Sequence, residues 1–296
     1  MYIVQSLNDM NRLGPVSVGG SNPARIMGII NTSPESFYKK SVYKKQEIAK
    51  IVKQMEEDGA DIIDVGGMST APYLKTLVPE KIEIERVTQA IHIIQNATNL
   101  PISIDTCRAS VAKAAFDLGV EILNDVTGLH HDDNMISILQ DNSPSVILCA
   151  FSKKPVSGNM IQQTRNLLQN SISIAVKSGI SKNKIVVDPA IGFFRKNARG
   201  IFFTKINSDW LKRDIATLQN LKSIKLGHPI LVSVSRKSFI GSLLDEKDPD
   251  KRLYGSLAAE VIAVLNGADV IRTHNVKATC DAIKIAQDLK KSKKGL

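Results

Sequence analysis

Eight short runs rich in β-branched and other apolar residues recur along the chain. They cover residues 25–30, 61–66, 101–106, 121–126, 145–150, 184–189, 229–235 and 269–274. The stretches between them carry apolar residues three and four positions apart, which is the spacing of a helix. Several runs follow a glycine suited to the left-handed end of a helix, as at Gly59, Gly119 and Gly267. The order predicts strand and helix alternating eight times.

Apolar strands joined by helices are typical of a parallel sheet, and eight such units favour a closed barrel over an open sheet. The chain has 296 residues, 43% of them hydrophobic, which suffices for one α/β domain of this kind. We expect a single (β/α)8 barrel of TIM type over residues 25–290. An irregular extension or short hairpin over residues 1–24 is expected to close its bottom, and residues 291–296 form a basic tail.

Composition limits the partners and the location of the protein. No run of about 18 apolar residues occurs, and the amino terminus lacks a basic segment followed by a long apolar one. We therefore expect a cytoplasmic protein with no membrane span. The net charge of +10 favours anionic partners, but part of it lies in the tail, and the few aromatic residues are not interleaved with basic ones. A nucleic-acid partner is not expected.

Polar residues stand where most of the predicted strands end. In a parallel barrel all these ends meet at one face, so residues distant in sequence are brought together there. The set comprises Asn31, Asp64, Asp105, Asn124, Asp125, Asp188, Ser235, Arg236, Lys237, Ser238, Arg272 and His274. The fifth strand alone contributes no residue to this set.

The strand ends sort into two chemistries. Asp105, Asn124 and Asp188 offer planar donors and acceptors suited to a heterocycle with amide and amino edges. A second group supplies cations or neutral donors suited to phosphate or carboxylate oxygens, namely Asn31, Lys237, Arg272 and His274. The sequence predicts a site with one half for a ring and one half for an anion.

The stretch SVSRKSFIGSLL, residues 233–244, places two cations and two hydroxyls between a strand and a helix. It is either a solvated corner or a site for an anion. Ser238 stands where free backbone N–H groups favour a negative group, although it could equally serve as a plain helix cap. Both roles remain open at this point.

Seven segments resemble, in order and spacing, the motifs of the dihydropteroate synthase family. They read MGIINTSPESF, IIDVGGMST, ISIDT, ILNDVTG, VVDPAIGF, VSRKSFIG and IRTHNV, and the resemblance runs from about residue 25 to residue 290. It implies a (β/α)8 barrel that condenses dihydropterin pyrophosphate with 4-aminobenzoate, or a related arylamine, and releases pyrophosphate. It also implies a magnesium ion and a homodimer formed through the last helices.

The resemblance assigns roles to individual positions. The pterin would be held by Asp105, Asn124, Asp188 and Lys237, with Arg272 over its face. Pyrophosphate would be held by Asn31, Arg272 and His274, and Asn31 would also reach the magnesium ion. The arylamine would be held by Ser235, Ser238, Phe193, Pro72 and Thr70.

The loops depart from the family pattern. YKKSVYKK replaces a stretch usually like SDGG, and Ala71 stands where the family has an arginine that would clamp phosphate. Lys39, Lys40, Lys44 and Lys45 are candidates to supply that charge. Ala190 replaces a glycine, FRKNARG replaces a glycine and a lysine, and Asn275 replaces an aspartate. The departures leave the pterin half better matched than the arylamine and phosphate loops.

Two alternatives to the synthase are a pterin-binding methyltransferase and a non-catalytic pterin-binding homologue. Arg272, His274 and Asn31 favour the synthase over the methyltransferase, because methyl transfer has no pyrophosphate to hold. Ala71 is the main argument for a non-catalytic barrel.

The cluster HHDD at 130–133 could suggest a metal site, but adjacent loop residues rarely converge on one ion, and Asp132 or Asp133 suits a helix cap.

Overall fold

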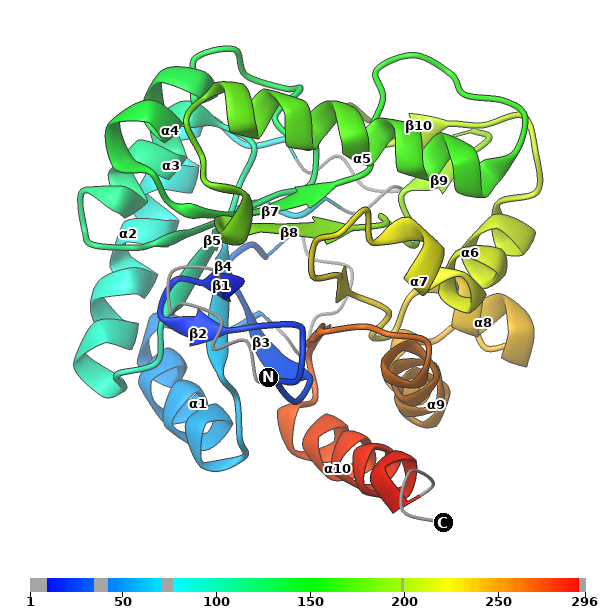
Figure 1. The fold of residues 1–296 in the computed structure, drawn as a ribbon. Coiled ribbons are helices and arrows are strands. Elements are labelled where there is room, and N and C mark those ends of the chain that lie inside the picture. The colour runs from blue at the N-terminus through cyan, green and yellow to red at the C-terminus, as the bar shows by residue number, and fades with distance from the viewer. Residues whose placement is uncertain (1–9, 35–41, 71–76, 198–199, 293–296) are drawn as a thin grey trace, which may run out of the picture.

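The computed structural model describes residues 10–34, 42–70, 77–197 and 200–292. Its central sheet contains eight parallel strands in the order β11-β12-β3-β4-β5-β6-β7-β8. A parallel bridge between Val187 and Ile230 links the two outer strands and closes the barrel. The predicted fold class is confirmed, with helices packed around the strands (Figure 1).

The barrel strands are short. They are β3 (Arg25–Asn31), β4 (Ile62–Gly66), β5 (Ile102–Asp105), β6 (Ile122–Asp125), β7 (Ser145–Cys149), β8 (Ile185–Asp188), β11 (Leu231–Val232) and β12 (Val270–Thr273). Each strand overlaps one of the eight runs predicted from the sequence. The seventh run gives the shortest strand, because only residues 231 and 232 pair with β12 before the chain turns toward the next helix.

The helices of the barrel follow the strands as expected. They are α1 (Lys45–Glu57), α2 (Glu80–Ala97), α3 (Ala109–Phe116), α4 (Met135–Asn142), α5 (Met160–Lys177), α6 (Trp210–Gln219), α7 (Leu221–Ile224), α8 (Ser238–Leu244), α9 (Leu253–Leu265) and α10 (Val276–Ser292). Their apolar faces bury residues such as Ile48, Val52 and Met55 of α1 against the outside of the sheet. No helix in the described ranges is both long and apolar enough to cross a membrane.

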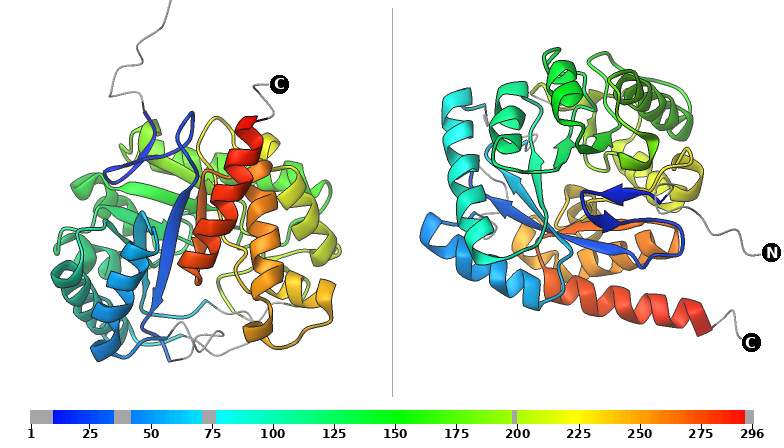
Figure 2. Two further views of the ribbon diagram at one scale, coloured as in Figure 1. Left: turned by 90° about the horizontal axis from the view of Figure 1, so that it is seen from below. Right: turned by 60° about the vertical axis from the view of Figure 1, so that its left-hand side comes forward.

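Two small pairs of strands lie outside the barrel. The hairpin of β1 (Arg12–Leu13) and β2 (Val16–Ser17) lies at the end of the barrel where β3 begins (Figure 2). Leu13 and Val18 pack there against barrel residues and fill the opening. The second pair, β9 (Phe194–Arg195) with β10 (Thr204–Lys205), is parallel and shapes the long loop after β8. Strands of two residues carry no alternation, so the sequence did not predict this pair.

Candidate active site

Along four of the strands, β4, β6, β8 and β12, the interior of the barrel changes from apolar to polar within two residues. Residues that fill the lower interior include Met27, Ile62, Ile122, Ile147, Val186, Leu231 and Val270. Side chains two positions apart in a strand share a face. Asp64, Asn124, Asp188 and Arg272 therefore lie directly above this apolar layer. Sequence residues far apart are thus gathered at one mouth, at the carboxyl ends of the strands.

A side chain on the outer face of a barrel strand has a different role from one on the inner face. Asp125 follows Asn124 and is buried, and its carboxylate accepts hydrogen bonds from Thr127 and from the backbone N–H of Leu129. These contacts hold the turn after β6. Of the two adjacent polar residues, only Asn124 belongs to the interior of the barrel.

Arg272 joins two carboxylates across the barrel mouth. Its Nε donates to Oδ2 of Asp64 and its Nη2 donates to Oδ2 of Asp105, each at 2.6 Å. Burial by itself would lower the pKa of Arg272, but the two carboxylates outweigh it and raise the pKa. The guanidinium is a fixed cation that orients both acids.

Asp64 has one carboxylate oxygen without a hydrogen-bond donor among the described residues. Its Oδ2 also accepts from Nδ2 of Asn124 at 3.1 Å, whereas its buried Oδ1 has no hydrogen-bond donor among the described residues. A buried carboxylate oxygen without a donor is costly, so it is a natural acceptor for an N–H group of a ligand. The sequence pointed to Asp64 only as a polar strand end and gave it no role.

Burial shifts the two other interior acids. The pKa of Asp105 is raised to about 7, mainly by burial and against the pull of Arg272. Burial also raises the pKa of Asp188, which Lys237 partly offsets. Oδ1 of Asp188 accepts the backbone N–H of Ala190 at 2.7 Å. Acids whose pKa is raised by burial in one cavity are typical of active sites.

Lys237 lies on the Asp188 side of the mouth. Its Nζ donates to the carbonyl oxygen of Ile191 at 2.5 Å and lies 4.7 Å from the centre of the Phe193 ring. Burial lowers its pKa to about 8, although Asp188 favours the charged form. Lys237 is thus a cation whose charge depends on pH near neutrality.

His274 is a neutral group in this site. Its Nδ1 lies 3.0 Å from Oγ of Ser235. Burial lowers its pKa to about 3, and the charges of Arg272, Arg236 and Lys237 act in the same direction. The imidazole therefore offers a neutral N–H donor.

Asn31 ends β3 next to the Asp105 side of the mouth. Its position pairs with Gly66 in β4. A Cβ atom on Gly66 would lie 3.5 Å from Oδ1 of Asn31 and 3.8 Å from Cβ of Asp105. The absence of a side chain at Gly66 keeps the space between these two groups open.

The segment Ser-Arg-Lys-Ser divides between two roles. Arg236 has a φ of 58° and points away from the mouth. It donates to Oδ1 of Asn275 and to the carbonyl oxygens of Pro249 and Asp250. Arg236 thus holds the loop before α9, and the cation of the segment that faces the mouth is Lys237.

Ser238 is not a helix cap. The cap position of α8 is Lys237, and Oγ of Ser238 instead accepts a hydrogen bond from Nη2 of Arg195 at 2.6 Å. The alternative that Ser238 caps this helix is therefore wrong. Phe193, beside this group, stacks on Phe203 with ring centres 5.5 Å apart.

The remaining predicted residues belong to the segments that follow β3 and β4 in the sequence. Thr70 is half-buried at the end of a described range. Pro72, Ala71, Lys39 and Lys40 lie outside the described residues, so their predicted roles stay predictions. Lys44 and Lys45 lie at the start of α1, where Glu47 accepts from the backbone of Lys44.

The HHDD segment serves the packing of its loop. His130 and His131 have ring neighbours, Phe151 and Phe202 respectively. Asp132 accepts from the backbone N–H groups of Ala109 and Asn134, so it joins the starts of α3 and α4. The N-cap of α4 is Asn134, so the prediction that Asp132 or Asp133 caps this helix is wrong, although Asp132 holds the turn before it.

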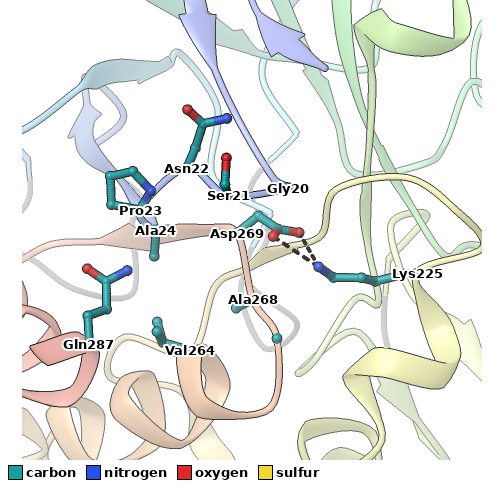
Figure 3. Close-up of a pocket in the computed structure, with 11 residues that line it drawn as sticks. Gly20, Ser21, Asn22, Pro23, Ala24, Lys225, Val264, Ala268, Asp269 and Gln287 are labelled. Carbon is teal, nitrogen blue, oxygen red and sulfur yellow. Dashed lines mark hydrogen bonds and ion pairs between the residues drawn. The ribbon is translucent and has the colours of Figure 1, made fainter. Parts of the chain in front are cut away.

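A second hollow lies at the opposite end of the barrel. It measures about 500 Å3 and lies between residues 20–24, the start of β12 and the last two helices (Figure 3). Its charged groups serve each other, since Lys225 pairs with Asp269 at 2.7 Å, and Asp269 also accepts from the backbone of Ile230. The polar mouth at the carboxyl ends is the better candidate for an active site.

The chain is similar to proteins of one known family. Residues 27–274 match the family model described as "Pterin binding enzyme". The dihydropteroate synthase of Synechocystis sp. is 33% identical over 273 residues, which is 89% of each chain. That of Bacillus subtilis is 33% identical over 265 residues, which is 89% of this chain and 87% of the relative.

Solved structures show the same likeness. Xanthomonas albilineans dihydropteroate synthase with 4-aminobenzoic acid superposes with a TM-score of 0.79 at 30% identity, over 91% of this chain and 94% of that one. The Coxiella burnetii enzyme in complex with pteroic acid gives a TM-score of 0.78 at 34% identity, over 90% and 93%. The chain belongs to the dihydropteroate synthase family of pterin-binding enzymes.

Two residues of the mouth were missed by sequence reasoning. Arg195 and Asp214 come from the loop after β8 and from α6, and neither ends a strand of the barrel. The ion pair between them has an N–O distance of 3.4 Å. No spacing rule relates them, because a loop fold brings them together.

Proposed function

We propose that the protein condenses dihydropterin pyrophosphate with 4-aminobenzoate to form dihydropteroate and pyrophosphate, as a step of folate biosynthesis. One observation carries the proposal: the acids Asp64, Asp105 and Asp188 lie in one mouth with the cations Lys237 and Arg272. The relatives support the reaction, since solved structures of the family hold pteroic acid and 4-aminobenzoic acid.

The acidic half suits the pterin ring. Asp105, Asn124 and Asp188 would accept from or donate to its amide and amino edges, and Lys237 would donate to a ring acceptor. Arg272, fixed by its two carboxylates, would lie against the face of the ring. The buried acids also favour a ring that becomes electron-deficient during the reaction.

The remaining donors suit the pyrophosphate. Asn31 and Arg272 would bind its oxygens. His274 would donate from Nε2 while its Nδ1 accepts the Ser235 hydroxyl, an assignment that fits a neutral imidazole. A neutral donor fixed in place stabilises developing negative charge without first losing a proton of its own.

Magnesium fits this arrangement through oxygen ligands. The amide oxygen of Asn31 is a hard ligand, and no cluster of three His, Cys, Asp or Glu residues in the described ranges could form a cage for a metal. Magnesium usually takes one or two protein oxygens and completes its shell with substrate phosphates and water. When bound, it would supply positive charge to the pyrophosphate.

The reaction needs no covalent enzyme intermediate. The bond between the pterin methylene carbon and the pyrophosphate oxygen breaks, and both electrons leave with pyrophosphate. The nitrogen of the arylamine then bonds to that carbon and loses a proton. Asp105 and Asp188 stabilise the cationic pterin, and Arg272 with His274 stabilise the leaving group.

Pyrophosphate release tests the proposal. The protein is incubated with dihydropterin pyrophosphate, magnesium and 4-aminobenzoate, and release is followed with and without the arylamine. Asp188→Asn and Lys237→Met should each lower turnover about 10²-fold or more, because each removes a preorganised contact. The control Lys154→Met changes an exposed lysine outside the mouth and should keep normal turnover. Near-normal turnover in Lys237→Met with an unchanged melting temperature would refute the assignment.

A homodimer through the last helices is part of the proposal. Large apolar side chains stay exposed there: Tyr254 (83%), Ile262 (44%), Ile285 (63%) and Leu289 (65%). Exposed apolar side chains on adjacent helices are a common mark of an interface. Ile285→Asp should therefore shift the protein from dimer to monomer in sedimentation velocity, whereas Lys284→Asp on the same helix should not.

The cytoplasmic location also stays a prediction, which cell fractionation tests.

A further inference from the structure

The hydroxyl of Ser238 has its proton available. Nη2 of Arg195 lies 2.6 Å from Oγ of Ser238. A guanidinium has donors only, so Ser238 must be the acceptor in this bond. None of the hydrogen bonds described for Ser238 uses the hydroxyl as a donor, which leaves its proton for an acceptor in the mouth.

The guanidinium of Arg195 is held in place on several sides. Nη1 donates to the carbonyl oxygen of Phe194 at 2.7 Å and lies 3.4 Å from Oδ2 of Asp214. Its central carbon lies 4.1 Å from the centre of the Trp210 ring. Simultaneous contacts with a carbonyl, a carboxylate and a hydroxyl suit the planar fork of arginine, which a lysine lacks.

The charges around Ser238 do not balance. Asp214 forms both of the ion pairs described for Arg195 and Arg213. It also accepts the backbone N–H of Gly192 with both oxygens. Two buried guanidinium groups thus share one carboxylate. A net positive charge remains beside the hydroxyl, where it favours an anion.

We propose that Arg195 is a positioning residue that makes the arylamine half of the mouth selective for an arylamine with a negatively charged group. Arg195 fixes the Ser238 oxygen as acceptor, so that the hydroxyl donates to a carboxylate, and its own charge lies behind that contact. The inference rests on the proposed function, because it takes Ser238 as part of the arylamine site. It adds a residue that comes from the altered loop after β8.

Selectivity between two arylamines tests the proposal. The ratio of kcat/KM for 4-aminobenzoate to that for neutral 4-aminobenzamide is measured in the wild type, Arg195→Met, Arg195→Lys and the control Lys196→Met, which changes an exposed neighbour. In Arg195→Met the ratio should fall about tenfold or more, because a charged contact is lost. The KM for dihydropterin pyrophosphate should stay within about twofold of the wild type, and Lys196→Met should match the wild type throughout.

Other outcomes decide the matter as well. An equal loss for both arylamines would mean that Arg195 only supports the loop, and it would overturn the proposal, as would an unchanged ratio. If Arg195→Met does not fold, Arg195→Lys decides: a fall of about threefold or more supports the proposal, because lysine has no fork, and no fall overturns it.

Failure of the proposed function would look different. Absence of pyrophosphate release in the wild type would refute the reaction, and calorimetry of the two arylamines would then replace kinetics. A preference for the anion that Arg195→Met abolishes would still support the role of Arg195. Equal binding of both arylamines by the wild type would overturn it.

Discussion

Nη2 of Arg272 lies 2.6 Å from Oδ2 of Asp105, although 167 positions separate the two residues in the sequence. The second contact of Arg272, to the fully buried Asp64, makes the guanidinium the common partner of two acids. This relationship ties the last strand of the barrel to its second and third strands in sequence order. The stability of the barrel and the shape of its mouth thus depend on the same side chain.

Arg272→Met should therefore destabilise the protein. It leaves the fully buried Asp64 and the partly buried Asp105 without their cation, and breaking a buried pair in this way typically costs about 3–5 kcal/mol. Urea denaturation at pH 8 measures the free energy of unfolding. Adding Asp105→Asn should restore at least about 1 kcal/mol, because one of the uncompensated charges is then gone. A single variant as stable as the wild type would contradict this account.

Turnover should depend on pH in the neutral range. Below about 7, Asp105 takes up a proton and its ion pair with Arg272 weakens; above about 8, Lys237 loses its charge. We expect kcat/KM for dihydropterin pyrophosphate to be highest between about 7 and 8. Lys237→Arg should remove the decline on the alkaline side, since an arginine stays charged. The substrate titrates identically in both proteins, so an identical alkaline decline would exclude Lys237 as its cause.

Glu260 should make the protein less stable as the pH rises. Its Oε2 accepts from Thr279 at 2.8 Å, but its buried Oε1 has no donor among the described residues. Burial raises the pKa from 4.5 to about 7. The folded state thus holds a proton that the unfolded state releases between about 4.5 and 7, so stability falls as pH rises through this range.

Glu260→Gln removes this titration. The variant should be more stable than the wild type at pH 8, by on the order of 1–3 kcal/mol, and similar to it at pH 4.5. Urea denaturation at the two pH values measures the difference. The surface variant Glu57→Gln serves as the control. If the difference in free energy of unfolding between Glu260→Gln and the wild type is the same at both pH values, Glu260 does not titrate in this range.

Strand periodicity predicted most of the mouth, and loops account for what it did not predict. The polar residues at the strand ends identified Asp105, Asn124 and Asp188 as neighbours, because the barrel brings the strand ends together whatever the loops do. Arg195 lies in a loop whose shape depends on contacts with α6 and α8. Asp214 and Ser238 lie 19 and 43 positions from Arg195 in the sequence. Contacts over such separations leave no local pattern in the sequence.

The segment after β11 shows the same limit. The sequence indicated that Arg236 and Lys237 stand together at a strand end. Only the backbone conformation separates them, since the positive φ of Arg236 turns its side chain toward the loop before α9. Adjacent side chains in a turn have no fixed period, so sequence could not assign one to the mouth and the other to the loop.

Gly192 has a backbone and a packing requirement that can be separated. Its φ is 91°, and a Cβ atom there would lie 2.8 Å from Cδ of Lys237. Gly179, after α5, has a φ of 87° but open space around its Cβ position. Alanine at either position should cost about 1 kcal/mol or more of stability, because alanine disfavours positive φ. Only Gly192→Ala should also displace Lys237 and lower kcat/KM for dihydropterin pyrophosphate, by about tenfold. Thermal unfolding and steady-state kinetics on both variants separate the two effects, and equal kinetics in the two would mean that Lys237 tolerates the displacement.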